Sequence, residues 1–182
     1  MISLPELAAR SQKFGCIVAD PPWEVMAGPG WNSNGRSRPL TYPTMTADEI
    51  ASMPVRDLIA KDGVLFLWTI NKYLERTYEI ARNWGFRPVS LLTWCKPKHG
   101  LGLGGAFVNT SEFILYCRRG KPAIKRRSDT SWWEWKRGPH SKKPEAFHDI
   151  VESMFDGPYL ELFARRERHG WTTWGNEVPC AV

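Results

Sequence analysis

The sequence predicts an α/β fold, an open β-sheet covered by helices on both faces, and three observations predict it. Strand-like runs alternate with helical stretches along the chain, which is the pattern of an α/β sheet. Most of the runs are continuously apolar, as is typical of strands buried on both faces. The length of 182 residues suits one domain, and we expect a single domain over residues 1–182.

The strand-like runs have the composition of a buried sheet. They lie at 14–19, 63–69, 88–94, 112–117, 159–164 and 171–175. Three of the ten tryptophans, Trp68, Trp84 and Trp94, fall in apolar runs, and we expect them in the core.

The stretches between these runs carry helix signals, at 46–60, 70–84 and 143–155. Thr46 and Glu49 have capping-box spacing, although Pro54 should end or kink that helix early. Gly85 follows the second stretch as a C-terminal glycine would, and Pro144 suits the first turn of the third.

The first strand-like run ends in Asp20-Pro21-Pro22-Trp23. Two consecutive prolines can neither continue a strand ladder nor enter a helix interior, so the chain must leave the sheet directly after the carboxylate. In open α/β sheets, ligands bind beyond the carboxyl ends of the strands. We therefore expect Asp20 and Trp23 to project into a crevice where chemistry takes place.

Three long segments match neither strand nor helix, at 26–43, 98–111 and 119–143. Loops of this length in a compact domain are usually functional or disordered, and all three could border one site. The segment 100–105 spells GLGLGG and matches GxGxxG, but a strand-like run rather than a helix follows it. This favours a substrate loop over a dinucleotide site.

The balance of charge favours a polyanionic partner. The net charge is +6, and ten tryptophans interleave with Lys and Arg, as stacking on unpaired bases requires. The basic run 121–138, KPAIKRRSDTSWWEWKRG, either follows a phosphate backbone or is a solvated charged loop. The sequence leaves both open.

The four cysteines argue against a metal site, because Cys16, Cys95, Cys117 and Cys180 have no CxxC or Cys-His spacing. The first residues lack a basic segment followed by an apolar one, and no apolar run reaches about 18 residues. We expect a cytoplasmic protein that makes no contact with a membrane.

With DPPW at the end of an apolar strand, the chain resembles the DPPW-type adenine methyltransferases, the family of the messenger-RNA adenosine methyltransferase catalytic subunit and its bacterial and phage relatives. The resemblance covers nearly the whole chain. It extends, in the family's order, over KFGCIVADPPWEV, LTYPTMTADEIASMPV, DGVLFLWTINKYLERTYEIARNWGFRPV, LLTWCKP, SEFILYCRRGKP, HSKKPEAFHDIVESM and YLELFARRERHGWTTWGNEV. It implies a Rossmann-like methyltransferase domain with a mostly parallel sheet and a permuted motif order. It also implies S-adenosylmethionine as the cofactor, and no metal.

The resemblance implies that the catalytic residues are Asp20, Pro21, Pro22 and Trp23. The adenine amine is a poor nucleophile because its lone pair is delocalised into the ring. Acceptors aimed at its two hydrogens, the Asp20 carboxylate and the Pro21 carbonyl, would orient that lone pair toward the methyl donor. Trp23 would stack on the base once the base has left its helix or strand.

The resemblance also implies the cofactor and substrate contacts. Cofactor binding is expected within residues 143–178 and at Asp20, through Lys143, Arg165, Arg168, Asn176 and Glu177. Lys142 is a rival for the role of Lys143, and Glu167-Arg168 replaces a common His-Asn pair of the family. Tyr42 and Glu112 would line the pocket for the target base, although a core tyrosine and a structural acid are alternatives.

The sequence thus predicts transfer of a methyl group from S-adenosylmethionine to the 6-amino group of adenine in nucleic acid, with DNA favoured over RNA but not decided. One alternative is a catalytically silent nucleic-acid-binding partner subunit; such family members usually have a broken Asp-Pro-Pro-Trp tetrad, whereas here the tetrad is intact. Another is cytosine 4-amino methylation, which usually has Ser in place of Asp20. A homo- or heterodimer partner is left open.

Overall fold

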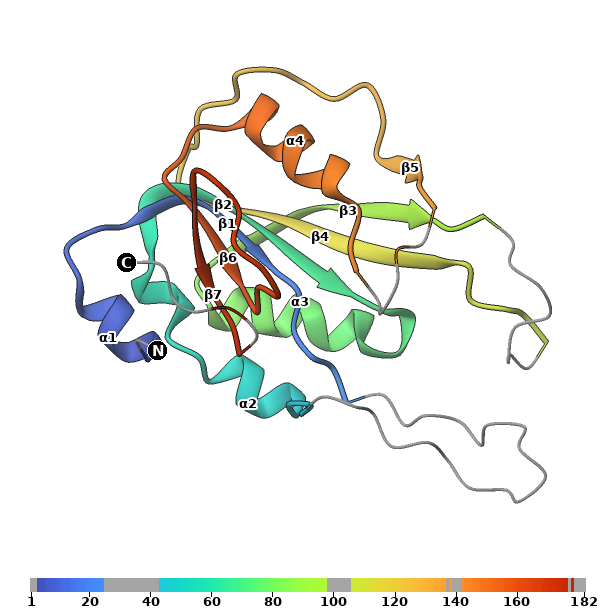
Figure 1. Ribbon diagram of the computed structural model, residues 1–182, viewed down its shortest axis with the longest axis horizontal. Coiled ribbons are helices and arrows are strands. Elements are labelled where there is room, and N and C mark those ends of the chain that lie inside the picture. The colour runs from blue at the N-terminus through green and yellow to red at the C-terminus, as the bar shows by residue number, and fades with distance from the viewer. Residues whose placement is uncertain are drawn as a thin grey trace.

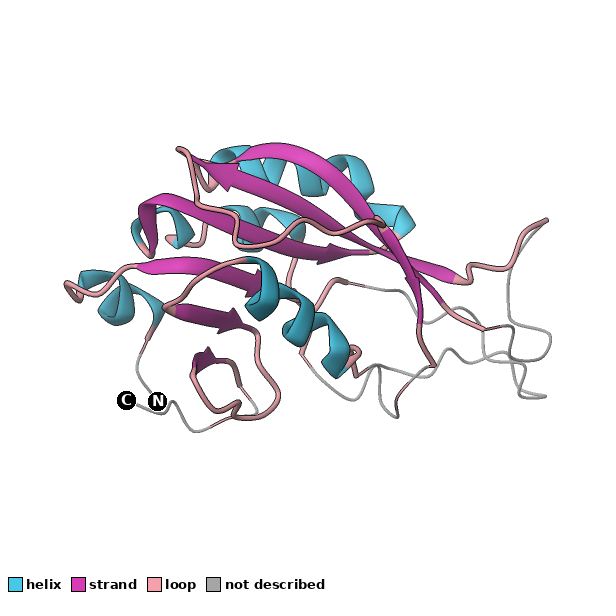
Figure 2. Cartoon of the chain, turned by 90° about the horizontal axis from the view of Figure 1, so that it is seen from above, coloured by secondary structure: helices cyan, strands magenta, loops and turns pink. Residues whose placement is uncertain are grey.

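The computed structural model describes residues 3–24, 43–97, 106–136, 138, 142–176 and 178. Within them, one seven-stranded sheet has the order β5-β3-β4-β2-β1-β6-β7 (Figures 1 and 2). The strands are β1 (Phe14–Ala19), β2 (Ile59–Thr69), β3 (Arg87–Cys95), β4 (Ser111–Arg119), β5 (Trp132–Glu134), β6 (Tyr159–Leu162) and β7 (Trp171–Trp174). The α-helices are α1 (Leu4–Ala9), α2 (Ala47–Ala51), α3 (Leu74–Asn83) and α4 (Glu145–Met154), with 3₁₀ turns η1 (Val55–Asp57) and η2 (Asn71–Tyr73).

The sheet is mostly parallel, as expected. β1 pairs in parallel with β2 and β6, β6 with β7, and β3 with β5, while β4 runs antiparallel to β2 and β3. The carboxyl ends of the parallel strands and the amino end of β4 therefore share one edge of the sheet. This edge receives the residues that follow β1, β3, β6 and β7, together with those that open β4.

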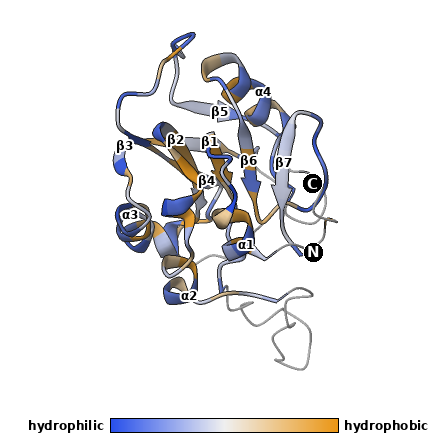
Figure 3. Ribbon diagram, turned by 90° about the vertical axis from the view of Figure 1, so that its left-hand side faces the viewer, coloured by the Kyte–Doolittle hydropathy of each residue, from blue (hydrophilic) through white to orange (hydrophobic). Residues whose placement is uncertain are grey.

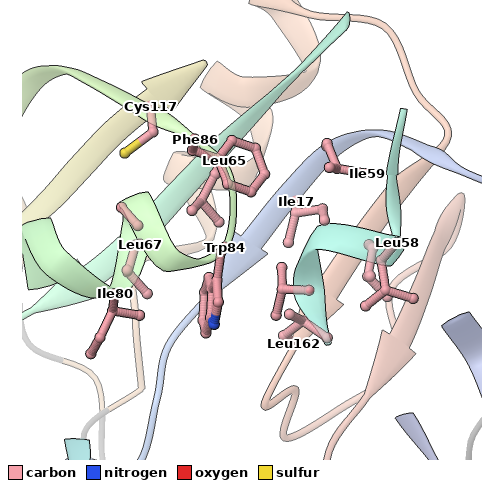
Figure 4. Packing of buried hydrophobic residues seen from close by; sticks show 14 of the residues in the cluster. Ile17, Leu58, Ile59, Leu65, Leu67, Ile80, Trp84, Phe86, Cys117 and Leu162 are labelled. Carbon is pink, nitrogen blue, oxygen red and sulfur yellow. The ribbon is translucent and has the colours of Figure 1, made fainter. Parts of the chain in front are cut away.

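Helices cover both faces of the sheet, α4 on one and α2 with α3 on the other (Figure 1). Apolar residues concentrate between these layers (Figure 3). On the α3 face, Ile17, Leu65, Leu67 and Ile80 pack around Trp84 (Figure 4). The Trp84 Nε1–H donates a hydrogen bond of 3.1 Å to the Ile50 carbonyl, which satisfies the indole inside the core.

The second cluster lies under α4. Val18, Phe66 and Trp68 of the sheet pack there against Phe147 and Val151 of the helix. Trp68, Trp84 and Trp94 are all buried, which confirms them as core residues. Among the described residues, no helix has both the length and the apolar character needed to cross a membrane.

The elements differ from the sequence-based expectation at their ends. α2 stops at Ala51, before Pro54, and its Thr46–Glu49 capping box forms as predicted. β2 starts at Ile59 rather than at residue 63, because its first residues pair beside β1. α1 and β5 were not predicted; α1 has only six residues and β5 three, too few for a periodic pattern to show.

Candidate active site

The Asp20-Pro21-Pro22-Trp23 segment leaves the sheet at the carboxyl end of β1, between β2 and β6. The Trp23 N–H donates to the Pro21 carbonyl at 2.8 Å, and the Met45 N–H donates to the Pro22 carbonyl at 2.9 Å. The prolines thus end the strand as predicted and tie the tight turn to the segment before α2. The Pro21 carbonyl keeps one of its two lone pairs for another donor.

Trp23 does not project into a crevice, contrary to the expectation from the sequence. Its side chain is only 5% exposed. Its Nε1–H donates to the Trp68 carbonyl at 3.1 Å, and its ring stacks on Tyr73 with centroids 5.0 Å apart and an interplanar angle of 18°. The polar tip and one face of the indole are therefore engaged by β2 and η2, and base stacking by Trp23 stays a prediction.

A cavity of about 400 Å³ opens beside the Asp20 carboxylate. It is bounded by the residues that follow β1, β6 and β7 at the sheet edge. Its lining includes Asp20, Pro22, Phe163, Arg165 and Asn176. Three of the predicted cofactor contacts, Asp20, Arg165 and Asn176, thus lie around one cavity.

The walls of this cavity depend on how β6 and β7 end. Phe163, directly after β6, has φ of 64°, a left-handed conformation that is costly for a bulky residue. A Cβ atom added to Gly175, directly after β7, would lie 2.2 Å from the Ala164 carbonyl oxygen. Only glycine lets the two chain segments approach this closely, and the approach fixes the wall of the cavity.

Asp20 also takes part in a chain of alternating charges. The Lys143 Nζ lies 2.8 Å from Asp20 Oδ2 and 3.4 Å from Glu112 Oε2. Glu112, at the start of β4, is also paired with Lys96, which follows β3. All four side chains are largely buried, with Lys96 only 8% exposed. Three of these residues were predicted from the sequence as site residues; Lys96 was not, although it stands in the LLTWCKP block.

The pKa values of this chain follow from burial and from the neighbouring charges. Burial raises the pKa of the Asp20 carboxyl, and Lys143 only partly opposes it. For Glu112, burial also acts upward, but Lys143 and Lys96 together outweigh it and lower the pKa. For Lys143, burial acts downward, but Asp20 and Glu112 outweigh it and raise the pKa of the ammonium. Lys143 therefore stays charged and favours the carboxylate form of Asp20.

A second, smaller cavity of about 50 Å³ adjoins Asp20 on the α4 side of the sheet. Phe163 and Arg165 line it as well as the larger cavity, so the two spaces meet at Asp20. The remaining walls are rich in charge, with the cations Lys142, Lys143 and Arg166, the acid Glu161, and His148.

Arg168, a predicted cofactor contact, lies elsewhere. Its guanidinium group pairs with three acids of α4: 2.7 Å to Asp149, 2.9 Å to Glu152 and 3.5 Å to Glu145. Burial acts to lower the pKa of Arg168, but these acids outweigh it and raise the pKa. The structure does not bring Arg168 to either cavity, because the acidic face of the helix holds it.

Other predicted features lie outside the described residues. These are Tyr42, Glu177, residues 26–42 of the predicted loop 26–43, residues 98–105 of the predicted loop 98–111, and residues 137 and 139–141 of the predicted loop 119–143. In the part of the chain that is described, no group of three or more His, Cys, Asp or Glu side chains could hold a metal ion.

The family model of MT-A70 matches residues 14–177, which include every element that borders the two cavities. The chain belongs to the MT-A70 family. This confirms the family resemblance that the DPPW block predicted.

Curated relatives have similar sequences over most of this chain. The type II methyltransferase M.MunI of Mycoplasma sp is 29% identical over 96% of this chain and 81% of its own length. An N(6)-adenosine-methyltransferase MT-A70-like protein of Arabidopsis thaliana is 30% identical over 91% of this chain. The human N(6)-adenosine-methyltransferase catalytic subunit METTL3 is 27% identical over 91% of this chain. The chain spans 24% and 28% of the last two relatives, respectively.

Proposed function

We propose that this chain transfers a methyl group from S-adenosylmethionine to the exocyclic 6-amino group of adenine in nucleic acid. The observation that carries the proposal is the position of Asp20. Its carboxylate follows β1 at the sheet edge and lines both the 400 Å³ cavity and the smaller charged one. The matched relatives that are named adenosine methyltransferases support the same reaction.

The two cavities fit the two ends of S-adenosylmethionine. The larger one has the size for a nucleoside, and the exposed Asn176 at its wall offers hydrogen bonds to ribose hydroxyls. The smaller one is lined by Lys142, Lys143 and Arg166, which suit a carboxylate. It also contains His148, whose two buried ring nitrogens make no hydrogen bond to the described residues. Polar groups left in this state fit a cavity that receives a polar ligand.

The cofactor supplies a methyl group made electrophilic by its bond to a sulfonium. The chain's own residues prepare the other reactant. The Asp20 carboxylate and the free lone pair of the Pro21 carbonyl accept the two amine hydrogens of adenine and turn the nitrogen lone pair out of the ring plane. Asp20 must be ionised to do so, and Lys143, at 2.8 Å, favours that state against the effect of burial.

We place DNA ahead of RNA as the substrate. The chain matches the type II methyltransferase over 81% of that protein's length, against about a quarter for the adenosine methyltransferases. The net charge of +6 suits either polyanion.

Labelled S-adenosylmethionine, offered with single- and double-stranded DNA and RNA and followed by nucleoside analysis, tests the proposal. We expect label in N6-methyladenine, with more in DNA. Label in 4-methylcytosine, or none on any polymer from a protein that binds the cofactor, would contradict the proposed function. The second result would favour a silent partner subunit.

A further inference from the structure

A cluster of buried polar side chains lies on the α4 face of the sheet, beneath Asp20. Glu161 of β6 is in register with Val18 of β1 and with Thr173 of β7, so these three side chains share one face of the sheet. His148 of α4 reaches the same place, with its Nε2 3.3 Å from Glu161 Oε2. His148 is 5% exposed and Thr173 is fully buried.

The cluster is not satisfied by the chain itself. Neither ring nitrogen of His148, nor the Thr173 hydroxyl, has a hydrogen-bond partner among the described residues. The 3.3 Å approach of His148 to Glu161 brings the imidazole and carboxylate together without the alignment of a hydrogen bond. Buried polar groups are nearly always paired in folded proteins, so an incomplete cluster beside a cavity points to a missing polar partner.

The space beside the cluster limits what that partner is. The small cavity of about 50 Å³ is bordered by His148, Glu161, Asp20 and Lys143. This volume suits a small charged group and is less than a base or a sugar needs.

The charged residues on the cavity walls indicate where the positive and negative parts of a ligand would bind. Asp20 Oδ2 is already paired with Lys143 at 2.8 Å. Lys142 and Arg166 share the acid Glu145, so the positive charge on this wall exceeds the negative charge of that one partner and can attract a carboxylate. Glu161 is the acid on the β6 side of the cavity, and the His148 ring lies 3.3 Å from its Oε2 and limits where that carboxylate can move. The walls thus carry two acids, Asp20 and Glu161, and four cations, and an ammonium group next to a carboxylate, as in an α-amino acid, matches this mixture of charges.

We propose that Glu161, positioned by His148, binds the α-ammonium group at the methionine end of S-adenosylmethionine. The inference rests on the proposed function, since it assigns a further binding residue to the same cofactor. It accounts for an acid in the otherwise apolar run of β6, and for a buried histidine on the face of α4 that packs on the sheet.

Calorimetric titration with three ligands tests the inference without measuring catalysis. S-adenosylmethionine has both charged groups, decarboxylated S-adenosylmethionine keeps only the ammonium, and 5′-methylthioadenosine has neither. Glu161→Gln keeps the shape and removes the charge. We expect it to weaken the first two ligands about 10- to 100-fold, the range of a hydrogen bond to a charged group, and to change 5′-methylthioadenosine less than about 2-fold.

Matched variants separate a binding role from a structural one. Glu75→Gln removes the charge of an exposed acid on α3 that lines neither cavity, and we expect it to leave the affinities for all three ligands within about 2-fold of wild type. His148→Gln, which keeps a polar group beside Glu161, should retain more affinity for the two ammonium ligands than His148→Phe. Should Glu161→Gln fold poorly, Glu161→Asp keeps the charge one methylene further back and should weaken the same two ligands selectively.

Two results would overturn the inference. Equal losses for Glu161→Gln on all three ligands would show a structural role, and unchanged affinities would show that Glu161 does not touch the ligand. Failure of the wild-type protein to bind any of the three would instead contradict the proposed function, so the two failures are distinguishable.

Discussion

The ion pair between Lys143 and Asp20 should contribute to the stability of the fold, and this can be tested without measuring catalysis. In Lys143→Met the stem of the side chain is kept and the ammonium is lost. Asp20 and Glu112 then remain in a largely buried place, with Lys96 still beside Glu112 and only the charge of Arg165 still acting to favour the Asp20 carboxylate. Breaking a buried pair in this way costs about 3–5 kcal/mol of the free energy of unfolding. Because Asp20 and Lys143 keep 22% and 17% exposure, we expect the lower end, about 3 kcal/mol.

The opposite single change should cost much less. In Asp20→Asn, Lys143 keeps Glu112 at 3.4 Å, and the removed charge is one that burial already disfavours. The double variant Lys143→Met/Asp20→Asn removes the carboxylate at residue 20 together with its Lys143 partner, so it should be more stable than Lys143→Met alone. Urea unfolding of the four proteins, followed by circular dichroism, gives the coupling energy, which we expect to be about 2 kcal/mol in favour of the pair.

The pH dependence of this difference follows from the sign of the shifts. The folded pKa of Lys143 is raised above its ordinary 10.5, so its contribution to stability is complete below pH 10.5 and is lost as the pH rises through the folded pKa. The wild-type advantage over Lys143→Met should therefore hold at neutral pH and shrink at strongly alkaline pH. Single effects that add within about 0.5 kcal/mol would refute the reasoning, because independent sites behave in that way.

Three other predictions concern the surroundings of the site. Gly175→Ala should destabilise the fold more than Gly170→Ala. A Cβ would clash with backbone at residue 175, whereas at residue 170 it would meet nothing within 4 Å and only the φ of 80° is unfavourable. Equal urea midpoints for the two variants would contradict the close approach at Gly175. Trp23→Phe should cost about 1–2 kcal/mol of unfolding free energy, because a buried carbonyl loses its indole donor; an unchanged midpoint would mean that the hydrogen bond contributes nothing. Burial raises the pKa of the Cys117 thiol to about 12. At pH 8 a thiol reagent should therefore modify the half-buried Cys95 first and the buried Cys117 only on unfolding, which mass spectrometry of peptides would show. Equal modification rates for the two cysteines would contradict the burial of Cys117.

Much of the sheet was predictable because its strands are continuous apolar runs. The turn after Asp20 was predictable too, since two prolines leave the chain no way to extend β1. The position of Trp23 was not. Its burial depends on Tyr73, which lies in a separate element and offers its ring face only once the chain has folded.

The charge chain shows the same limit. A family motif indicates that Lys143 belongs to the site, but sequence spacing cannot show that its ammonium pairs with Asp20 and Glu112, which come from distant strands. Arg168 was expected at the cofactor because it stands where the family often has a His-Asn pair, yet it pairs with three acids on α4 and lines neither cavity. Glu161 had a signal that could have been used, because an acid within a buried apolar run is costly unless it has a partner.

The most direct test of the central claim compares wild type with Asp20→Asn in one methyl-transfer assay. Both proteins receive labelled S-adenosylmethionine and the preferred polymer, and the affinity for the cofactor is measured on the same samples. We predict N6-methyladenine from the wild type, a rate at least about 10²-fold lower for Asp20→Asn, and cofactor affinities within a few fold of each other. Near-wild-type methylation by folded Asp20→Asn would contradict the claim that Asp20 orients the adenine amine.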